Sequence, residues 1–83
     1  MARFLYFSWV REKIGASTEQ LTLPPEVAKV AEVLDFLRGI DVAHAAAIAH
    51  PNLRVAVNQV YARMEDPVSD TDEIALFPPV SGG

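Results

Sequence analysis

The chain has 83 residues, of which 51% are hydrophobic, and its formal net charge is −4. This composition excludes a disordered acidic chain, and the length suits one small domain, residues 1–83, with little room for a deep catalytic cleft. The Lys and Arg residues are scattered singly, which disfavours nucleic-acid binding, and the absence of cysteine excludes disulfides and thiolate metal sites.

The opening run of the chain is apolar, but it is too short to span a bilayer and lacks a signal-peptide cleavage pattern. We therefore expect a cytoplasmic protein without membrane contacts.

Residues 3–10 are rich in aromatic and β-favouring types, which predicts a strand. Its alternation places one set of side chains on one face, namely Phe4, Tyr6, Ser8 and Val10. The opposite face receives Arg3, Leu5, Phe7 and Trp9. Because arginine is costly to bury, this second face is either an exposed apolar surface that binds a protein or the covered face of a central strand.

The next segments predict a turn, a strand and a helix. Residues 11–15 are polar and predict a turn that closes at Gly15. Residues 19–23 alternate as a second strand, hairpinned to the first and ended by two prolines. From about Lys29 the apolar residues follow a helical period, and Gly39 supplies the stop.

A second, short helix is predicted over residues 42–50, with Asp41 as its N-cap. It contains both histidines of the chain, His44 and His50. At this spacing the two side chains lie about 120° apart around a helix axis, and no third metal ligand is close in the sequence. We therefore expect surface or helix-end histidines rather than a metal or acid–base site.

Residues 53–57 alternate cleanly and predict a strand with odd-numbered side chains inward and even-numbered ones outward. A turn at residues 58–59 leads into a short returning strand over residues 60–62. The polar loop over residues 65–73 carries carboxylates without the ligand spacing or central glycine of a calcium loop. It is either a solvated turn or a contact for a basic partner surface.

The last strand, residues 74–77, directs Ile74 and Leu76 inward and Phe77 outward. The element order predicts an α+β fold, a mixed sheet of about five strands with one main helix and a short second helix on one face. The first and last strands are expected to be central and parallel.

The chain ends in a segment, residues 78–83, that we expect to form an extended Gly-Gly tail. Pro78 and Pro79 cannot donate to a sheet ladder, so the strand should stop before them. Gly82 and Gly83 lack Cβ atoms and would form a thin tether that carries a carboxylate into another protein's active site. The alternative is an inert, disordered end.

Four segments carry a family resemblance: residues 7–12 (FSWVRE), 57–59 (VNQ), 70–75 (DTDEIA) and, above all, 76–83 (LFPPVSGG). Over essentially its whole length the chain resembles the small sulfur-carrier subunit of molybdopterin synthase, the MoaD family. The resemblance implies a ubiquitin-like β-grasp fold, which agrees with the predicted element order. Thr71 stands where relatives often have glycine, so this turn is expected to differ locally.

The resemblance also implies a carrier cycle in which this chain is not an enzyme on its own and binds no permanent cofactor. An activating enzyme would use ATP and magnesium to adenylate the Gly83 carboxylate, and a sulfur donor protein would convert the adenylate into a thiocarboxylate. Gly82 and Gly83 would then thread into the large catalytic subunit of a heterotetramer. There the sulfur would pass to cyclic pyranopterin monophosphate to form the molybdopterin dithiolene.

The docking residues implied by the resemblance lie on an outer sheet face and along the tail. They are Phe7, Tyr61, Phe77, Pro78, Pro79, Val80 and Ser81. Trp9 and Tyr61 are residue types that relatives vary, so partner selectivity is expected to be particular to this chain. The alternatives are a sulfur carrier for thiamine or cysteine synthesis, a ubiquitin-like protein modifier joined to lysines through Gly83, and a plain binding module.

Overall fold

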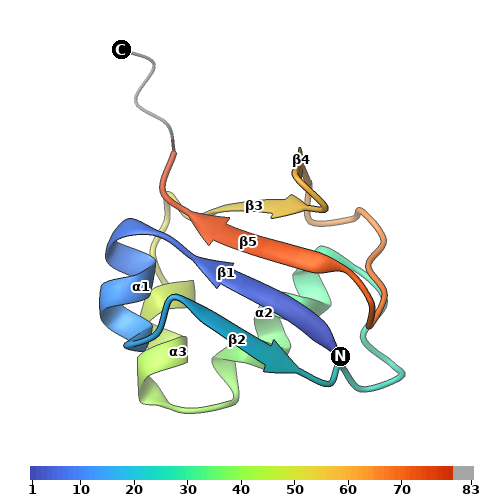
Figure 1. Cartoon of the computed structure of the whole chain (residues 1–83), viewed down its shortest axis with the longest axis horizontal. Helices are drawn as coiled ribbons and strands as arrows, with labels where there is room; N and C mark the ends of the chain where they lie inside the picture. The colour runs from blue at the N-terminus through green and yellow to red at the C-terminus, as the bar shows by residue number, and fades with distance from the viewer. Residues whose placement is uncertain (80–83) are drawn as a thin grey trace.

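The computed structural model describes residues 1–79, and a five-stranded mixed sheet with helices packed against it dominates them (Figure 1). The strand order across the sheet is β2-β1-β5-β3-β4. The elements in chain order are β1 (Ala2–Tyr6), α1 (Ser8–Ile14), β2 (Thr18–Leu21), α2 (Val30–Arg38), α3 (Val42–Ile48), β3 (Arg54–Val57), β4 (Val60–Tyr61) and β5 (Glu73–Phe77). This is the α+β architecture with a mixed five-stranded sheet that the element order predicted.

The first and last strands lie side by side in the middle of the sheet and run parallel, which confirms the prediction. Phe4 is aligned with Ile74, and Tyr6 with Leu76. On either side, β2 pairs antiparallel with β1, and β3 pairs antiparallel with β5. This arrangement brings the end of β5, where the tail begins, next to the end of β1.

The predicted strand over residues 3–10 is wrong beyond Tyr6. The backbone takes a left-handed conformation at Ser8 (φ 55°), and the chain then forms α1 instead of continuing the sheet. Val10 is buried and Ile14, four residues on, packs against the core, a spacing that suits a helix as well as an extended run. The predicted turn at residues 11–15 is therefore the second half of α1. It closes at Gly15 as expected, with φ 89° and its N–H bonded to the Arg11 carbonyl.

The two other helices confirm the predictions with small changes of boundary. Helix α2 buries Val30, Val33, Leu34 and Leu37, which are the apolar residues of its helical period. Helix α3 has Asp41 as its N-cap, whose Oδ1 accepts the backbone N–H of His44 at 2.8 Å. It ends at Ile48 rather than His50, because Pro51 disfavours helical backbone in the residue before it.

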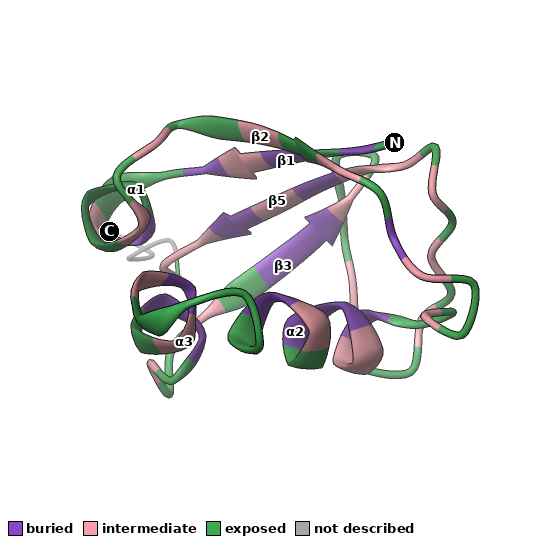
Figure 2. Cartoon of the chain, turned by 90° about the horizontal axis from the view of Figure 1, so that it is seen from below, coloured by how far each residue is buried: buried purple, intermediate pink, exposed green. Residues whose placement is uncertain are grey.

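The hydrophobic core lies between the sheet and helices α2 and α3, which cover one of its faces (Figure 2). The buried side chains of the two central strands, Phe4, Tyr6, Ile74 and Leu76, all point into it. In the predicted strand over residues 53–57, Val55 is buried as predicted, whereas Leu53 and Val57 are half-buried. Each helix in residues 1–79 falls short of the length and hydrophobicity that a membrane-spanning segment requires.

Ala56 departs from the predicted alternation, because it points outward yet is buried. It is aligned with Tyr61 on β4 and with Ala75 on β5, so neighbours on both strands shield its small side chain.

The hairpin between β3 and β4 turns at Asn58 and Gln59, which have φ values of 51° and 70°. Positive φ at both central residues matches the twist of a two-residue hairpin and confirms the predicted turn.

Candidate functional site

The candidate site begins where the chain leaves the sheet. Strand β5 ends at Phe77, and Pro78 and Pro79 follow outside any strand, as the two prolines predicted. The predicted tail residues Val80, Ser81, Gly82 and Gly83 lie outside the described residues.

The sheet face opposite the helices carries a set of apolar side chains around the end of β5. We call this set the outer apolar face, and it consists of Leu5, Phe7, Ala56, Tyr61, Ala75 and Phe77. In residues 1–79 no helix covers this face (Figure 2). Of the two readings left open for the first strand, an exposed apolar face is therefore the one found.

The outer apolar face contains three aromatic side chains that are exposed or partly exposed. Tyr61 is 70% exposed and Phe7 is 47% exposed, while Phe77 is half-buried between its neighbours. The rings of Tyr61 and Phe77 are in contact, with centroids 5.5 Å apart and a tilt of 38°. Side chains of this size exposed together are typical of a protein-binding surface.

Phe7 joins this face through the backbone. Its extended conformation (φ −123°, ψ 152°) continues β1 by one residue, so its side chain follows the direction of Leu5. Its N–H donates to the carbonyl of Leu76 at 3.2 Å, which fixes it beside the end of β5. The three predicted docking residues Phe7, Tyr61 and Phe77 therefore lie on one face, next to the point where the tail begins.

Trp9 does not belong to this face, contrary to the sequence prediction. It lies on α1, where it is half-buried and packs against the core. Its ring stacks on that of His50, with centroids 4.0 Å apart. The chain leaves the sheet plane at Ser8, so the alternation that assigned Trp9 to the outer face ends before it.

Two arginines border the outer apolar face, although the chain as a whole is acidic. Arg3 alternates with Leu5 on β1, and Arg54 on β3 is aligned with Phe77. Both are exposed, and within residues 1–79 neither forms an ion pair. Glu73, aligned with Arg3, is the acidic residue closest to them in the sheet register.

Three carboxylates of the loop over residues 65–73 accept hydrogen bonds from other parts of the same domain or from just before the loop. Asp66 accepts the N–H of Arg63 at 2.8 Å. The backbone N–H of Leu23, bonded to Asp70 at 2.7 Å, lowers the pKa of that carboxyl. The side-chain amide of Asn58 lowers the pKa of Asp72 in the same way. These contacts favour the interpretation of a structured, solvated turn.

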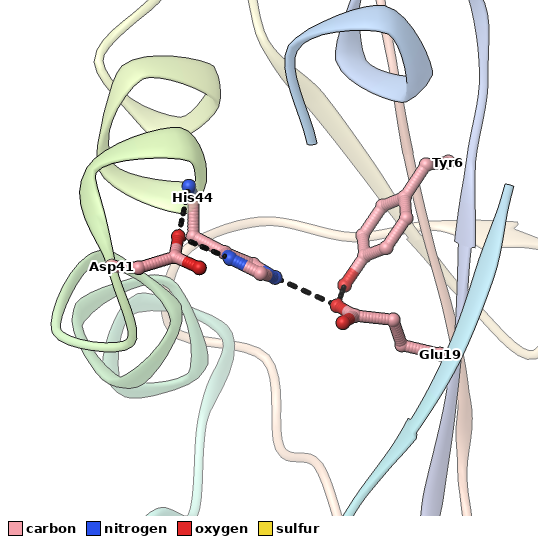
Figure 3. Close-up of polar contacts among 4 residues, drawn as sticks. All are labelled: Tyr6, Glu19, Asp41 and His44. Atoms are coloured by element: carbon pink, nitrogen blue, oxygen red, sulfur yellow. Dashed lines mark hydrogen bonds and ion pairs between the residues drawn. The ribbon is translucent and has the colours of Figure 1, made fainter. Parts of the chain in front are cut away.

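Within residues 1–79 we find neither a pocket nor a group of three or more side chains arranged to hold a metal ion. The main polar cluster is one that the sequence prediction missed. His44, expected at the surface or at a helix end, lies in the first turn of α3 but is only 4% exposed. It contacts Glu19 and Asp41, while Tyr6 contacts Glu19 (Figure 3). The available signal was Tyr6, because a tyrosine predicted to point into the core needs a partner for its hydroxyl.

A mixed sheet with parallel central strands, helices on one face and an open apolar face beside the exit of the chain defines a ubiquitin-like β-grasp protein. A solved structure of SAMP1 from Haloferax volcanii has the same fold, with a TM-score of 0.76 and 30% identity, covering 99% of this chain and 98% of that one. The fold prediction is therefore confirmed.

Sequence comparisons place the chain within this class. The model of the ThiS family matches residues 4–83. The molybdopterin synthase sulfur carrier subunits of Escherichia coli and Haemophilus influenzae are 32% and 37% identical to the chain, and each alignment covers 100% of both proteins. The chain belongs to the ThiS family, and its resemblance to the sulfur-carrier subunits of molybdopterin synthase is confirmed over its full length.

Proposed function

We propose that this chain is the sulfur carrier subunit of molybdopterin synthase. The observation that carries this proposal is the full-length match, at 32% and 37% identity, to two relatives with that name. The position of the outer apolar face supports it, because this face lies next to the segment that would enter a partner. The large catalytic subunit of the synthase is accordingly the main partner.

The chemistry would take place at the carboxyl group of Gly83. A carboxylate is a poor electrophile, so the activating enzyme first joins it to AMP from ATP and releases pyrophosphate. Sulfur that the donor protein delivers at the sulfide oxidation level then attacks the acyl carbon, AMP leaves, and a thiocarboxylate remains. When that sulfur passes to the pterin substrate, water supplies the oxygen that restores the carboxylate. Magnesium and ATP act in the activating enzyme, and no side chain of this chain serves as an acid or base.

The role of the folded domain is to hold the tail in place. In this proposal the outer apolar face docks on the partner while Pro78, Pro79, Val80 and Ser81 lead Gly82 and Gly83 into its active site. A site closed around the tail would exclude water, which would otherwise hydrolyse the acyl-adenylate. Arg3 and Arg54, which form no ion pair within residues 1–79, would face acidic side chains on the partner.

The proposal is tested by mass analysis of the C-terminal peptide. The chain is purified after co-expression with its activating enzyme and sulfur donor, and separately without the activating enzyme as a control. We expect the replacement of one oxygen by sulfur at Gly83 only in the first sample. Recovery of the unmodified acid alone from a sample that supports synthase activity would contradict the proposal.

A protein modifier is the second candidate, because the name SAMP1 in one neighbouring structure stands for small archaeal modifier protein 1. In that case Gly83 would form isopeptide bonds with lysines of other proteins. Mass analysis of all proteins in the cells that co-express the chain, its activating enzyme and the sulfur donor distinguishes the two functions. Branched Gly-Gly remnants on lysines of other proteins, without a thiocarboxylate on the free chain, would favour the modifier.

A further inference from the structure

The buried polar cluster around His44 has no part in the proposed function. Tyr6 of β1, Glu19 of β2 and His44 of α3 meet between the sheet and the helices, and Asp41 at the start of α3 completes the cluster (Figure 3). Tyr6 points to the opposite side of the sheet from Leu5, so the cluster is separated from the outer apolar face. An inference from it can therefore be tested without sulfur transfer.

The hydrogen-bond geometry determines the number of protons on the His44 ring. Nε2 lies 2.7 Å from Oε1 of Glu19, and Nδ1 lies 2.7 Å from Oδ1 of Asp41. An ionised carboxylate only accepts hydrogen bonds, so both ring nitrogens must donate. Neutral imidazole has a single N–H and would direct one lone pair at a carboxylate oxygen. With both carboxylates ionised, the arrangement fits the imidazolium, which carries a proton on each nitrogen.

We propose that the imidazolium of His44 is a proton-dependent clamp that holds α3 against the sheet, and that loss of its proton loosens α3 and also α1, which packs on it. The clamp joins three separate parts of the chain. His44 belongs to α3, Glu19 to the edge strand β2, and Tyr6, whose hydroxyl donates to Glu19 Oε1 at 2.7 Å, to the central strand β1. Ala47 and Ile48 of the same helix are buried and would move with it.

The charges around the ring favour the protonated form. Burial alone would lower the pKa of His44, but the hydrogen bonds and negative charges of Glu19 and Asp41 outweigh it and raise that pKa. Burial, followed by the contact with Glu19, raises the pKa of the Tyr6 hydroxyl, which stays a neutral donor. The backbone N–H of His44, together with its ring, lowers the pKa of Asp41 and keeps it ionised.

Charged residues on the two helices packed against α3 have no polar contact with the ring. On α2, Glu32 accepts the N–H of Ala28 and Asp35 pairs with Arg38. The charged residues of α1 are Arg11, Glu12 and Lys13, and all three are exposed. Within residues 1–79, Glu19 and Asp41 are therefore the charged groups in contact with the His44 ring.

Loosening of α3 would reach the side of the domain from which the tail leaves. Helix α3 packs against α1 at this end of the sheet (Figure 1). Helix α1 begins immediately after Phe7, whose N–H is bonded to Leu76 next to the end of β5. Proton loss at His44 should therefore change the packing of α1 and the environment of Phe7.

The sign of the pH dependence follows from the raised pKa. Below the ordinary histidine pKa of about 6.5, His44 is protonated in both the folded and the unfolded chain, and the clamp contributes fully. Above that pH the unfolded chain releases its proton while the folded one retains it. The folding equilibrium constant then falls by up to about tenfold per pH unit until the folded chain also loses the proton.

The test is an NMR titration of the wild-type chain with isotope-labelled histidine, with a His50→Gln variant to assign the two rings. We expect both ring nitrogens of His44 to be protonated in the folded protein at neutral pH. We also expect amide signals of α1 and α3 to shift as this proton is lost. A neutral His44 ring at that pH would overturn the proposal, and so would proton loss that leaves both helices unchanged.

A pair of charge-neutralising variants makes the test specific. Glu19→Gln removes the charge that faces Nε2, whereas Glu12→Gln makes the same change at an exposed position on α1. Only Glu19→Gln should lower the pH at which His44 loses its proton and reduce the pH dependence of unfolding. Equal behaviour of the two variants would overturn the assignment of Glu19. If Glu19→Gln fails to fold, the titration of the wild-type chain still decides the proposal.

Discussion

Replacement of Phe77 by alanine tests the outer apolar face most sharply. Phe77 is aligned with Arg54, its ring lies 5.5 Å from that of Tyr61, and the residue directly precedes the two prolines. It therefore occupies the centre of the proposed contact, where the truncation of an aromatic anchor costs about 1–3 kcal/mol of binding free energy. We expect the Kd for the large catalytic subunit to rise by about 5- to 150-fold.

The substitution also removes an aromatic pair from the free carrier, so the two effects must be separated. Loss of the contact with Tyr61 should reduce the free energy of unfolding by about 0.5–1.5 kcal/mol, which denaturant unfolding measures directly. Calorimetric titration with the large subunit is then performed where both chains are fully folded. Val42→Ala is the matched control, because Val42 is 86% exposed on α3, in the helical layer on the other face of the sheet. An unchanged Kd for Phe77→Ala would refute the docking role of this residue.

Three further substitutions give expected outcomes. Gly15→Ala should reduce the free energy of unfolding by about 1 kcal/mol, because the backbone φ is 89° at this position. Gly39→Ala should be tolerated, because φ is negative there and the nearest atom to an added Cβ lies at 3.6 Å; thermal unfolding of both variants checks this. Leu37→Ala empties a fully buried position on α2 and should reduce the unfolding free energy by about 2–5 kcal/mol; denaturant unfolding showing a loss below that of Val42→Ala would contradict the core placement. Arg54→Glu should slow association with the large subunit, and stopped-flow rates should converge with those of the wild type at high salt; a salt-independent difference would contradict the electrostatic role.

Much of the fold could be predicted because the spacing of apolar residues along short segments indicates a helix or a strand. The buried positions of α2 follow a helical repeat, and Ile74 and Leu76 of β5 alternate with partly exposed neighbours. Asp41 and Gly15 mark helix ends through local backbone chemistry. These features depend on short stretches of chain, so the sequence alone was enough to locate them.

The error at residues 8–14 has a local cause. Phe7, Trp9 and Val10 are β-favouring, and Val10 and Ile14 also fit one face of a helix, so the pattern does not distinguish the two structures. The left-handed turn at Ser8 decides between them, and serine is not a residue type that signals such a turn.

The buried cluster was missed because its partners come from distant parts of the chain. Glu19 and His44 are 25 positions apart and meet only when α3 packs beneath β2. The residues next to His44 in the sequence do not indicate that a carboxylate lies beside its Nε2. The outer apolar face was easier to predict, because the alternation of β1 and β5 already separates Leu5 and Phe77 from the core residues.

The central claim, that the carboxyl group of Gly83 carries the sulfur, is tested most directly by adding one alanine after Gly83. The wild-type chain and this variant are each supplied to the activating enzyme, sulfur donor and large subunit, and dithiolene formation is measured. The variant has no glycine carboxylate to activate, so we expect no product from it and normal product from the wild type. Normal product from a variant whose added residue is still present by mass analysis would contradict the account.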